Sequence, residues 1–290
     1  MITTAISQGL LWSILGLGIY LTFRILNFAD LTTEGSFPLG GAVCVASITH
    51  GVDPVIATLL GVLAGMLAGL ATGMLYTKGK IPVVLAGILV MSSLNSVMLF
   101  VMKSPNLSLL KQRKLFDVLD RFHFPGSFDT IILSIMIVIV VIASISWFLT
   151  TDLGQSYIAT GDNEIMAKSF GINTDRMKIL GLVMSNGLIA LAGALISQSE
   201  GYADVNKGIG VIVIGLSAII LGEIIFDNLT LVERLISIVF GSIIYQLIIL
   251  LVIQLNFDTT YLKLYSSVIL AICLLSPQLK TSKRLTKKGR

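Results

Sequence analysis

The chain has 290 residues, of which 55% are hydrophobic and only 12% charged, and its formal net charge is +4. A soluble domain carries about 25% charged residues, so this composition excludes an ordinary soluble domain. The small positive charge gives no indication of nucleic-acid binding. The two cysteines, Cys44 and Cys273, lie inside apolar runs, and the sequence has no Cys/His cluster, so it predicts neither a metal site nor a disulfide.

Apolar segments fill most of the chain, and most of them reach the roughly 17–25 residues that cross a bilayer core. The second segment is short, Gly-rich and contains Pro38, which favours a broken or partial helix. We therefore expect an all-α integral membrane protein with about 8–10 transmembrane helices. The predicted segments cover residues 6–26, 35–50, 54–76, 82–102, 130–148, 177–198, 208–225, 232–256 and 262–278.

Basic residues predict the orientation, because cytoplasmic loops carry an excess of Lys and Arg. Six of the twenty basic residues lie in the last eleven positions. We therefore expect one transmembrane domain over residues 1–278, followed by a basic cytoplasmic tail over 279–290. The N-terminus then lies outside, or inside if the segment 35–50 is re-entrant. The other parts placed in the cytoplasm are Arg24, the Lys78–Lys80 turn, the loop 149–178 and the turn 226–234.

An internal echo predicts two inverted repeats. Phe28-Ala29-Asp30-Leu31 and Tyr202-Ala203-Asp204-Val205 each follow a long apolar segment and precede a short Gly-rich one. The halves 6–102 and 177–278 are joined by the span 130–148, so they are offset by an odd number of spans and run in opposite directions. Transporters built this way carry interrupted helices near the membrane midplane.

Charged side chains in or beside the apolar segments need an explanation, because a charge at the bilayer centre costs about 2.5–3.5 kcal/mol on insertion scales. They either line a translocation pathway or cap the short helices, with Asp30 or Thr32 in the first half and Asp204 or Asn206 in the second. The residues predicted to line a pathway are Asn27, Asp30, Glu34, Asp204 and Asn206.

The loop 149–178 contains a short amphipathic helix over residues 163–170. We expect Gly161 and Asp162 to begin this helix and Gly171 to end it. Its apolar residues indicate that the helix packs either on the membrane surface or on a soluble partner that docks on the loop.

Two motifs in the chain match a known family. The block Ala159-Thr160-Gly161-Asp162-Asn163-Glu164, followed by Ala167, Gly171-Ile172 and Lys178, resembles the cytoplasmic signature of ABC importer permeases of the branched-chain amino acid and ribose type. Asn27-Phe28-Ala29-Asp30 with Glu34-Gly35 resembles the early signature of that family. The resemblance extends over nearly the whole chain.

This resemblance implies a non-enzymatic transport subunit that works with cytoplasmic ATP-binding-cassette subunits, an extracytoplasmic binding lipoprotein and a second copy of the permease. ATP and Mg would be bound by the ATPase, and the chain has no G-x-x-x-x-G-K-[ST] motif of its own. The residues that the resemblance assigns to ATPase coupling are Gly161, Asp162, Asn163, Glu164, Ala167, Lys168, Phe170, Gly171 and Ile172.

The sequence indicates the substrate less clearly than it indicates the family. Asp30 in place of the commoner His, and the run Leu31–Gly35, look most like a subgroup associated with tryptophan or tyrosine uptake. Branched-chain amino acids, sugars and nucleosides stay open as alternatives. An ion-coupled secondary transporter would share the inverted repeat and the acids but would leave the helix at 163–170 without a purpose. A membrane enzyme would need a catalytic constellation, and neither H-E-x-x-H nor G-x-S-x-G occurs.

Overall fold

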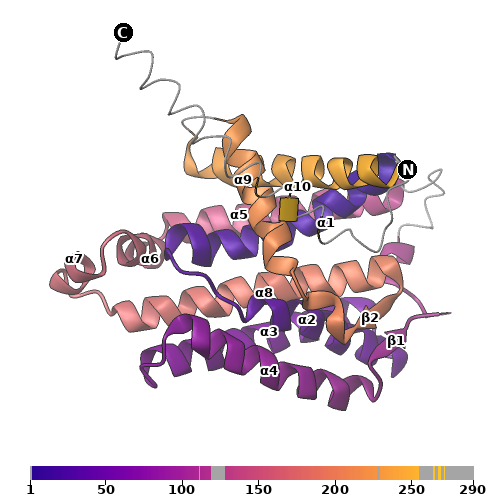
Figure 1. The fold of residues 1–290 in the computed structure, drawn as a ribbon, viewed down its shortest axis with the longest axis horizontal. Helices are drawn as coiled ribbons and strands as arrows, with labels where there is room; N and C mark the ends of the chain where they lie inside the picture. The colour runs from indigo at the N-terminus through magenta and orange to yellow at the C-terminus, as the bar shows by residue number, and fades with distance from the viewer. Residues whose placement is uncertain are drawn as a thin grey trace, which may run out of the picture.

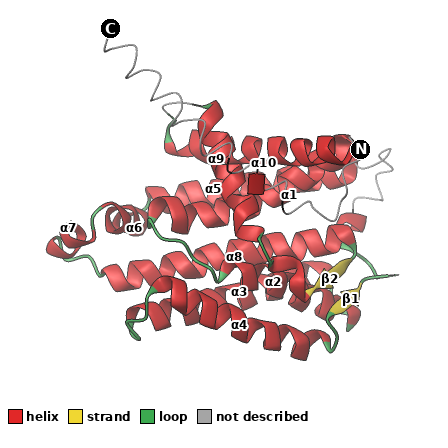
Figure 2. Ribbon diagram, in the orientation of Figure 1, coloured by secondary structure: helices red, strands yellow, loops and turns green. Residues whose placement is uncertain are grey.

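The structure is a computed structural model that describes residues 2–110, 112–118, 128–226 and 229–254, together with residues 264, 267, 268 and 271. The predicted span 262–278 lies outside the described residues except for these last four, and the predicted tail 279–290 lies wholly outside them. Within the described ranges the chain forms a bundle of helices with one small two-stranded sheet (Figure 2).

The helices follow the predicted segments to within a few residues, and the all-α membrane fold is confirmed. In the described part of the chain, seven helices are long and apolar enough to cross a membrane. The helices are α1 (Ile2–Tyr20), α2 (Thr33–Thr49), α3 (Pro54–Thr77), α4 (Val83–Met102), α5 (Phe128–Thr150), α6 (Asp152–Asp162), α7 (Glu164–Ser169), α8 (Thr174–Glu200), α9 (Val211–Ile225) and α10 (Leu231–Gln254).

The interruption in the first half lies before α2. The segment 35–50 was predicted as a broken or partial helix, and it forms one short helix of 17 residues without a break. α2 is continuous across Pro38, which lies in its second turn. A proline at this position removes one backbone donor and leaves the carbonyl of Glu34 without its usual partner. The true interruption is the non-helical stretch 26–32, which follows a π-helical turn at Leu21–Ile25 that ends the first span.

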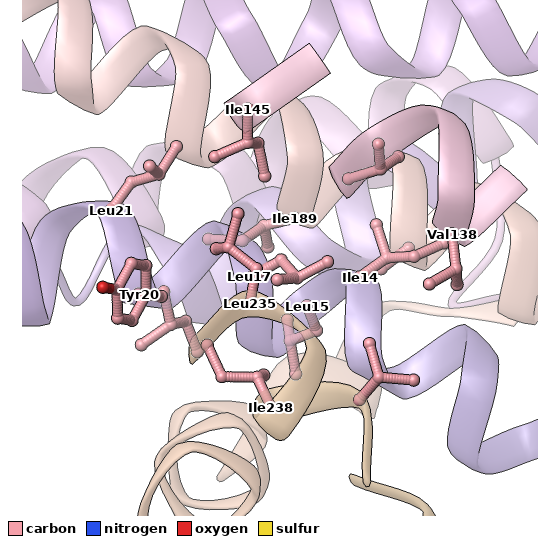
Figure 3. Packing of buried hydrophobic residues seen from close by; sticks show 14 of the residues in the cluster. Ile14, Leu15, Leu17, Tyr20, Leu21, Val138, Ile145, Ile189, Leu235 and Ile238 are labelled. Carbon is pink, nitrogen blue, oxygen red and sulfur yellow. The ribbon is translucent and has the colours of Figure 1, made fainter. Parts of the chain in front are cut away.

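Helix α1 lies at the centre of the bundle. Leu17 of α1 packs in one apolar cluster with Ile145 of α5, Ile189 of α8 and Ile238 of α10 (Figure 3). All four side chains are almost completely buried. The first span is thus enclosed by the linking span α5 and by helices of the second half. In contrast, α3, α4 and α5 expose many apolar side chains on their outer faces, as a lipid-facing surface requires.

The packing of the helices follows the predicted order of the two halves. α3 packs closely on α8, and its counterpart α10 packs closely on α1. Glycines make both contacts possible: a Cβ on Gly65 or Gly69 of α3 would overlap α8, and a Cβ on Gly9 of α1 would lie 2.7 Å from the Cα of Ile243 in α10. Small residues let membrane helices approach in this way.

The two ends of the bundle differ in structure. At one end, which we call the α7 end, α6 and α7 project beyond the long helices (Figure 1). At the other, the sheet end, β1 (Asn106–Ser108) pairs antiparallel with β2 (Tyr202–Asp204). The structure brings Arg24 to the α7 end, where it contacts Glu223 of α9, in agreement with the predicted grouping of the basic loops.

Candidate functional site

The two interrupted segments meet inside the bundle. Glu34, in the first turn of α2, accepts the backbone N–H of Gly210 through its Oε1 atom at 3.0 Å. Gly210 is the residue immediately before α9 and has a φ of +82°. Next to this hydrogen bond, the Glu34 carbonyl left free by Pro38 faces Gly208, where a Cβ would overlap it. The halves are therefore joined at this point by a side-chain-to-backbone hydrogen bond and by close approach of their backbones.

The two segments approach the junction from opposite ends. Residues 26–32 lead away from the α7 end, and α2 then continues to the sheet end. The 3-10 helix Val205–Gly208 leads away from β2 at the sheet end, and α9 then continues to the α7 end (Figure 1). Antiparallel passage of two related segments past one another is what the inverted-repeat prediction requires.

The repeated aspartates have the same local geometry. Asp30 accepts the N–H of Thr32 at 2.9 Å, and Asp204 accepts the N–H of Asn206 at 2.7 Å. Each carboxylate thus closes a turn two residues ahead of itself, just before a helix, as Asp side chains commonly do. Asp204 thereby caps the 3-10 helix Val205–Gly208. The predicted side-chain capping of α2 and α9 was wrong, because their N-caps, Thr32 and Gly210, make no side-chain cap hydrogen bond. The pathway role stays a prediction.

Asp30 lies in a buried polar network rather than on a surface of the chain. Its Oδ2 accepts a hydrogen bond from Asn186 of α8 at 2.7 Å, and Asn186 in turn accepts one from Ser36 at 2.6 Å. Thr32 and Thr72 of α3 join their hydroxyls at 2.8 Å beside it. Asp30 is 2% exposed and Asn186 is fully buried. The network holds α2, α3 and α8 together, and sequence reasoning missed Asn186 completely.

Asp204 and Asn206 lie at the sheet end. The second carboxylate oxygen of Asp204 accepts a hydrogen bond from Asn106 across the sheet at 3.3 Å, and Asn206 is exposed. Nearby, Lys207 pairs with Glu200 and lies over the ring of Tyr202, 4.9 Å from its centroid. The negative charge of Glu200 raises the pKa of Tyr202 above its usual value. The segment that carries Asp204 and Asn206 packs on α2, and Gly208 and Gly210 just after it contact Glu34.

Helix α7 begins one residue later than predicted. Asn163 caps it by accepting the N–H of Met166 at 3.0 Å, whereas Gly161 and Asp162 form the last turn of α6. The difference arises because residues 152–162 are helical, with Thr151 as their cap. The predicted end is confirmed: Gly171 adopts a φ of +81° directly after the C-cap Phe170.

Some apolar residues of α7 and its flanks face the bundle, and others are exposed at the surface. Ala167 is fully buried and Ile172 packs against the core of the bundle. Ile165 is 81% exposed, Phe170 is 76% exposed and Met166 is also exposed. Three large apolar side chains on one projecting turn exceed what an ordinary solvated loop presents, and such patches mark interaction surfaces.

Glu164 fixes α7 to the bundle. Its Oε1 atom lies 2.8 Å from the Nζ of Lys178 on α8 and 2.9 Å from the Nζ of Lys168 on α7. These two cations lower the pKa of Glu164 to about 2, so its carboxylate is charged at neutral pH. Glu164, which was predicted to take part in ATPase coupling, thus joins α7 directly to the membrane-spanning helix α8.

Asn27 belongs with this second cluster, although the prediction placed it with the pathway residues. It has a φ of +58°, which Asn tolerates better than most residues, and its Nδ2 donates to the carbonyl of Gly161 at 3.0 Å. Tyr157 of α6, which is buried, donates its hydroxyl to the carbonyl of Leu21 at 2.6 Å. Burial raises the pKa of Tyr157, so it stays protonated and able to donate.

The described residues contain no group of three or more His, Cys, Asp or Glu side chains that could hold a metal ion. The predicted absence of a metal site concerns the whole chain and stays a prediction for the remainder. What the described part of the chain does contain is a junction of two inverted segments and, at the α7 end, a projecting helix tied to the bundle.

Comparison with known proteins identifies the family. Residues 1–276 match the model of the permease component of the branched-chain amino acid transport system. The chain belongs to this permease family. It is a multi-pass inner-membrane permease component of an ABC importer, and the predicted resemblance is confirmed.

Individual relatives agree with this assignment. The chain is 39% identical to the tyrosine transport system permease protein of Clostridioides difficile, over 98% of this chain and 94% of that protein. It is 32% identical to the ribose import permease protein RbsC of Bacillus subtilis, over 70% of this chain and 62% of that protein. A solved chain of PsaBC from Streptococcus pneumoniae, in complex with Fab, shares the fold with a TM-score of 0.51 at 18% identity, over 94% of this chain and 88% of that chain.

Proposed function

We propose that this permease imports an aromatic amino acid, tyrosine or tryptophan, delivered by an extracytoplasmic binding lipoprotein. The relative from Clostridioides difficile, named for tyrosine transport, matches nearly the full length of both chains. The run Leu31–Gly35 favours the same subgroup. The ribose relative covers less of the chain at lower identity and supports a sugar less well.

We further propose that the α7 end is cytoplasmic and that a partner ATPase, which binds ATP and Mg, docks on α7. One observation carries this proposal: Ile165, Met166 and Phe170 project outward from a helix that Glu164 ties to α8. A helix held rigidly to the bundle can pass on the movement of a bound partner, which a mobile loop could not do.

Substrate would pass where the two inverted segments meet. The contact of Glu34 with Gly210 supports this placement, because a shift of either segment relative to the other changes the junction directly. Alternating access in inverted-repeat transporters proceeds by such rocking of one repeat against the other. A second copy of the permease would complete the pathway.

The substrate is tested in proteoliposomes that hold the permease with the ATPase and lipoprotein encoded beside it. Uptake of labelled tyrosine, tryptophan, leucine and ribose is compared with and without ATP. We expect ATP-dependent uptake of tyrosine or tryptophan that the other two solutes do not compete away. ATP-dependent uptake of leucine or ribose alone would overturn the aromatic assignment and leave the permease assignment intact.

Docking is tested with Ile165→Asp and Phe170→Asp. Both variants place a charge in the proposed contact, so the ATPase should no longer co-purify although the permease still inserts. Leu110→Asp is the matched control, because Leu110 is 81% exposed but follows β1 at the sheet end. Glu164→Lys, which reverses the charge facing Lys178, should uncouple hydrolysis from uptake. Normal assembly and transport in all three α7-end variants would remove the docking role.

A further inference from the structure

We propose that Asn27 and Phe28 are positioning residues that transmit displacement of α7 to the start of α2. The inference rests on the proposed docking of an ATPase on α7. Asn27 and Phe28 open the non-helical stretch 26–32, which joins the π-helical turn to α2 and contains the carboxylate of Asp30. Two independent chains of contacts connect these residues to α7.

The first chain of contacts runs through α6. The Asn27 side chain donates to the carbonyl of Gly161 at 3.0 Å, and Gly161 is two residues before the cap of α7. The backbones touch at the same place, because a Cβ on Gly161 would overlap the carbonyl oxygen of Ile25. A rigid movement of α6 and α7 therefore acts directly on the backbone that precedes residue 28.

The second chain of contacts runs through α8 and α3. Glu164 of α7 pairs with Lys178 at 2.8 Å, and the Nζ of Lys178 lies 5.0 Å from the ring centroid of Tyr76 on α3. The Tyr76 ring meets the ring of Phe28 edge to face at 5.7 Å. The Lys178 side chain is only 12% exposed, so solvent weakens this sequence of contacts little.

At its other end the stretch is fixed to α2 and to the junction. Asp30 accepts the N–H of Thr32 and a hydrogen bond from Asn186, which holds the first turn of α2 in place. Glu34, one turn further, carries the contact with Gly210. The stretch thus has one end on α6, which leads into α7, and the other on the meeting point of the two halves. A short non-helical segment between rigid elements is where hinge movement concentrates.

The two links can be cut separately. Asn27→Gly keeps the positive φ but removes the hydrogen bond to Gly161, whereas Asn27→Ala removes the bond and strains the backbone. Phe28→Leu keeps an apolar side chain but removes the edge-to-face contact with Tyr76. Asn95→Ala is the control, because Asn95 is an exposed amide on α4 outside both links.

The experiment uses the complete complex in proteoliposomes and measures substrate uptake per ATP hydrolysed. We expect Asn27→Gly and Phe28→Leu each to lower this ratio about fivefold or more, with ATPase binding and hydrolysis within twofold of the unaltered complex. A ratio unchanged in both variants would overturn the proposal. If the ATPase does not bind the unaltered permease at all, that result would instead refute the docking proposal.

Hydrogen exchange gives a readout that does not depend on transport. Binding of the ATPase to the unaltered permease should change exchange of the amides in residues 28–34 by about threefold or more. In Asn27→Gly and Phe28→Leu this response should shrink, while exchange in the free permease stays the same. A purely structural role would alter the free permease and leave the response intact, which would contradict the proposal.

Discussion

The carboxylate of Glu34 accepts the backbone N–H of Gly210 at 3.0 Å, and this bond joins residues 176 positions apart in the chain. It connects the beginning of α2 to the beginning of α9, the equivalent short helices of the two halves. Because the N–H lies at the open end of α9, it has no partner within that helix. A side chain from one repeat thus completes the hydrogen bonding of the other.

Removal of this acceptor should weaken the junction. Glu34→Ala leaves the N–H of Gly210 unpaired, at a cost of about 1–3 kcal/mol in unfolding free energy. Glu34→Gln keeps an oxygen that can accept and should stay near the unaltered value. Thermal unfolding in detergent, with uptake measured in parallel, checks both variants. Equal losses in the two would show that the negative charge, and not the hydrogen bond, matters.

Gly208 should tolerate no side chain. A Cβ there would overlap the Glu34 carbonyl and lie 2.8 Å from the ring of Pro38. Gly208→Ala should therefore force the segments apart, with an overpacking cost of about 1–3 kcal/mol and a severe loss of uptake. Gly51→Ala is the comparison, because Gly51 has open space around it and only a φ of +86° to strain. Similar uptake in the two variants would contradict the tight contact.

Asn186 should be among the most sensitive polar positions. Asn186→Leu leaves Asp30 without one of its donors and Ser36 without its acceptor, and unsatisfied buried groups cost about 1–3 kcal/mol each, more when charged. Asp30→Asn in the same background should recover part of the loss, because it removes the charge. A double-mutant cycle on thermal unfolding measures this, and additive losses would contradict the proposed network.

Arg24 and Glu223 should contribute little to stability despite good geometry. Two parallel contacts of 2.7 and 2.8 Å join their side chains, but Arg24 is half-exposed. Exposed pairs of this kind couple by about 0.2–1 kcal/mol and are screened by salt. A double-mutant cycle with Arg24→Gln and Glu223→Gln at low and high salt provides the test. Strong coupling that persists at high salt would indicate a buried pair.

The attachment of α7 through Glu164 should depend on pH only at acidic pH. Its pKa is about 2 in the folded chain, below the ordinary value of 4.5, so the ionised form is favoured by folding. The stabilising contribution is complete above about pH 4.5 and is lost as the pH falls toward 2. Hydrogen exchange of α7 amides, corrected for intrinsic rates, should show this loss. Glu164→Gln should show none, and a transition near neutral pH would contradict the assignment.

Sequence patterns located the long helices well and their polar contacts poorly. The thickness of the bilayer sets how many apolar residues a spanning helix needs, so the length of an apolar run locates the helix. For this reason α3, α4 and α8 begin and end within a few residues of the predicted positions. Pro38 led to the incorrect prediction of a break, because a proline in the second turn of a buried helix costs one hydrogen bond but need not end the helix. The repeated aspartate motif was found because each aspartate binds a backbone N–H only two residues further along the chain.

Contacts between distant segments gave no such signal. Asn186 is a single amide within an apolar span, and nothing beside it in the chain indicates Asp30 as its partner. Asn27 was grouped with the pathway because it neighbours Asp30, but its left-handed backbone turns it toward Gly161. Asn163 caps α7 in place of the predicted Gly161 and Asp162, because residues 152–162 are themselves helical and the sequence did not indicate that helix.

The enclosure of α1 has a consequence for biogenesis. Helix α1 ends up surrounded by α5, α8, α9 and α10, which are all synthesised after it. Insertion of α1 into lipid and its final packing must therefore be separate events, as in two-stage assembly of membrane proteins. Until α10 has arrived, Gly9 and Gly16 face lipid or the translocation machinery, so the packing of α1 depends on a helix synthesised more than 200 residues after it.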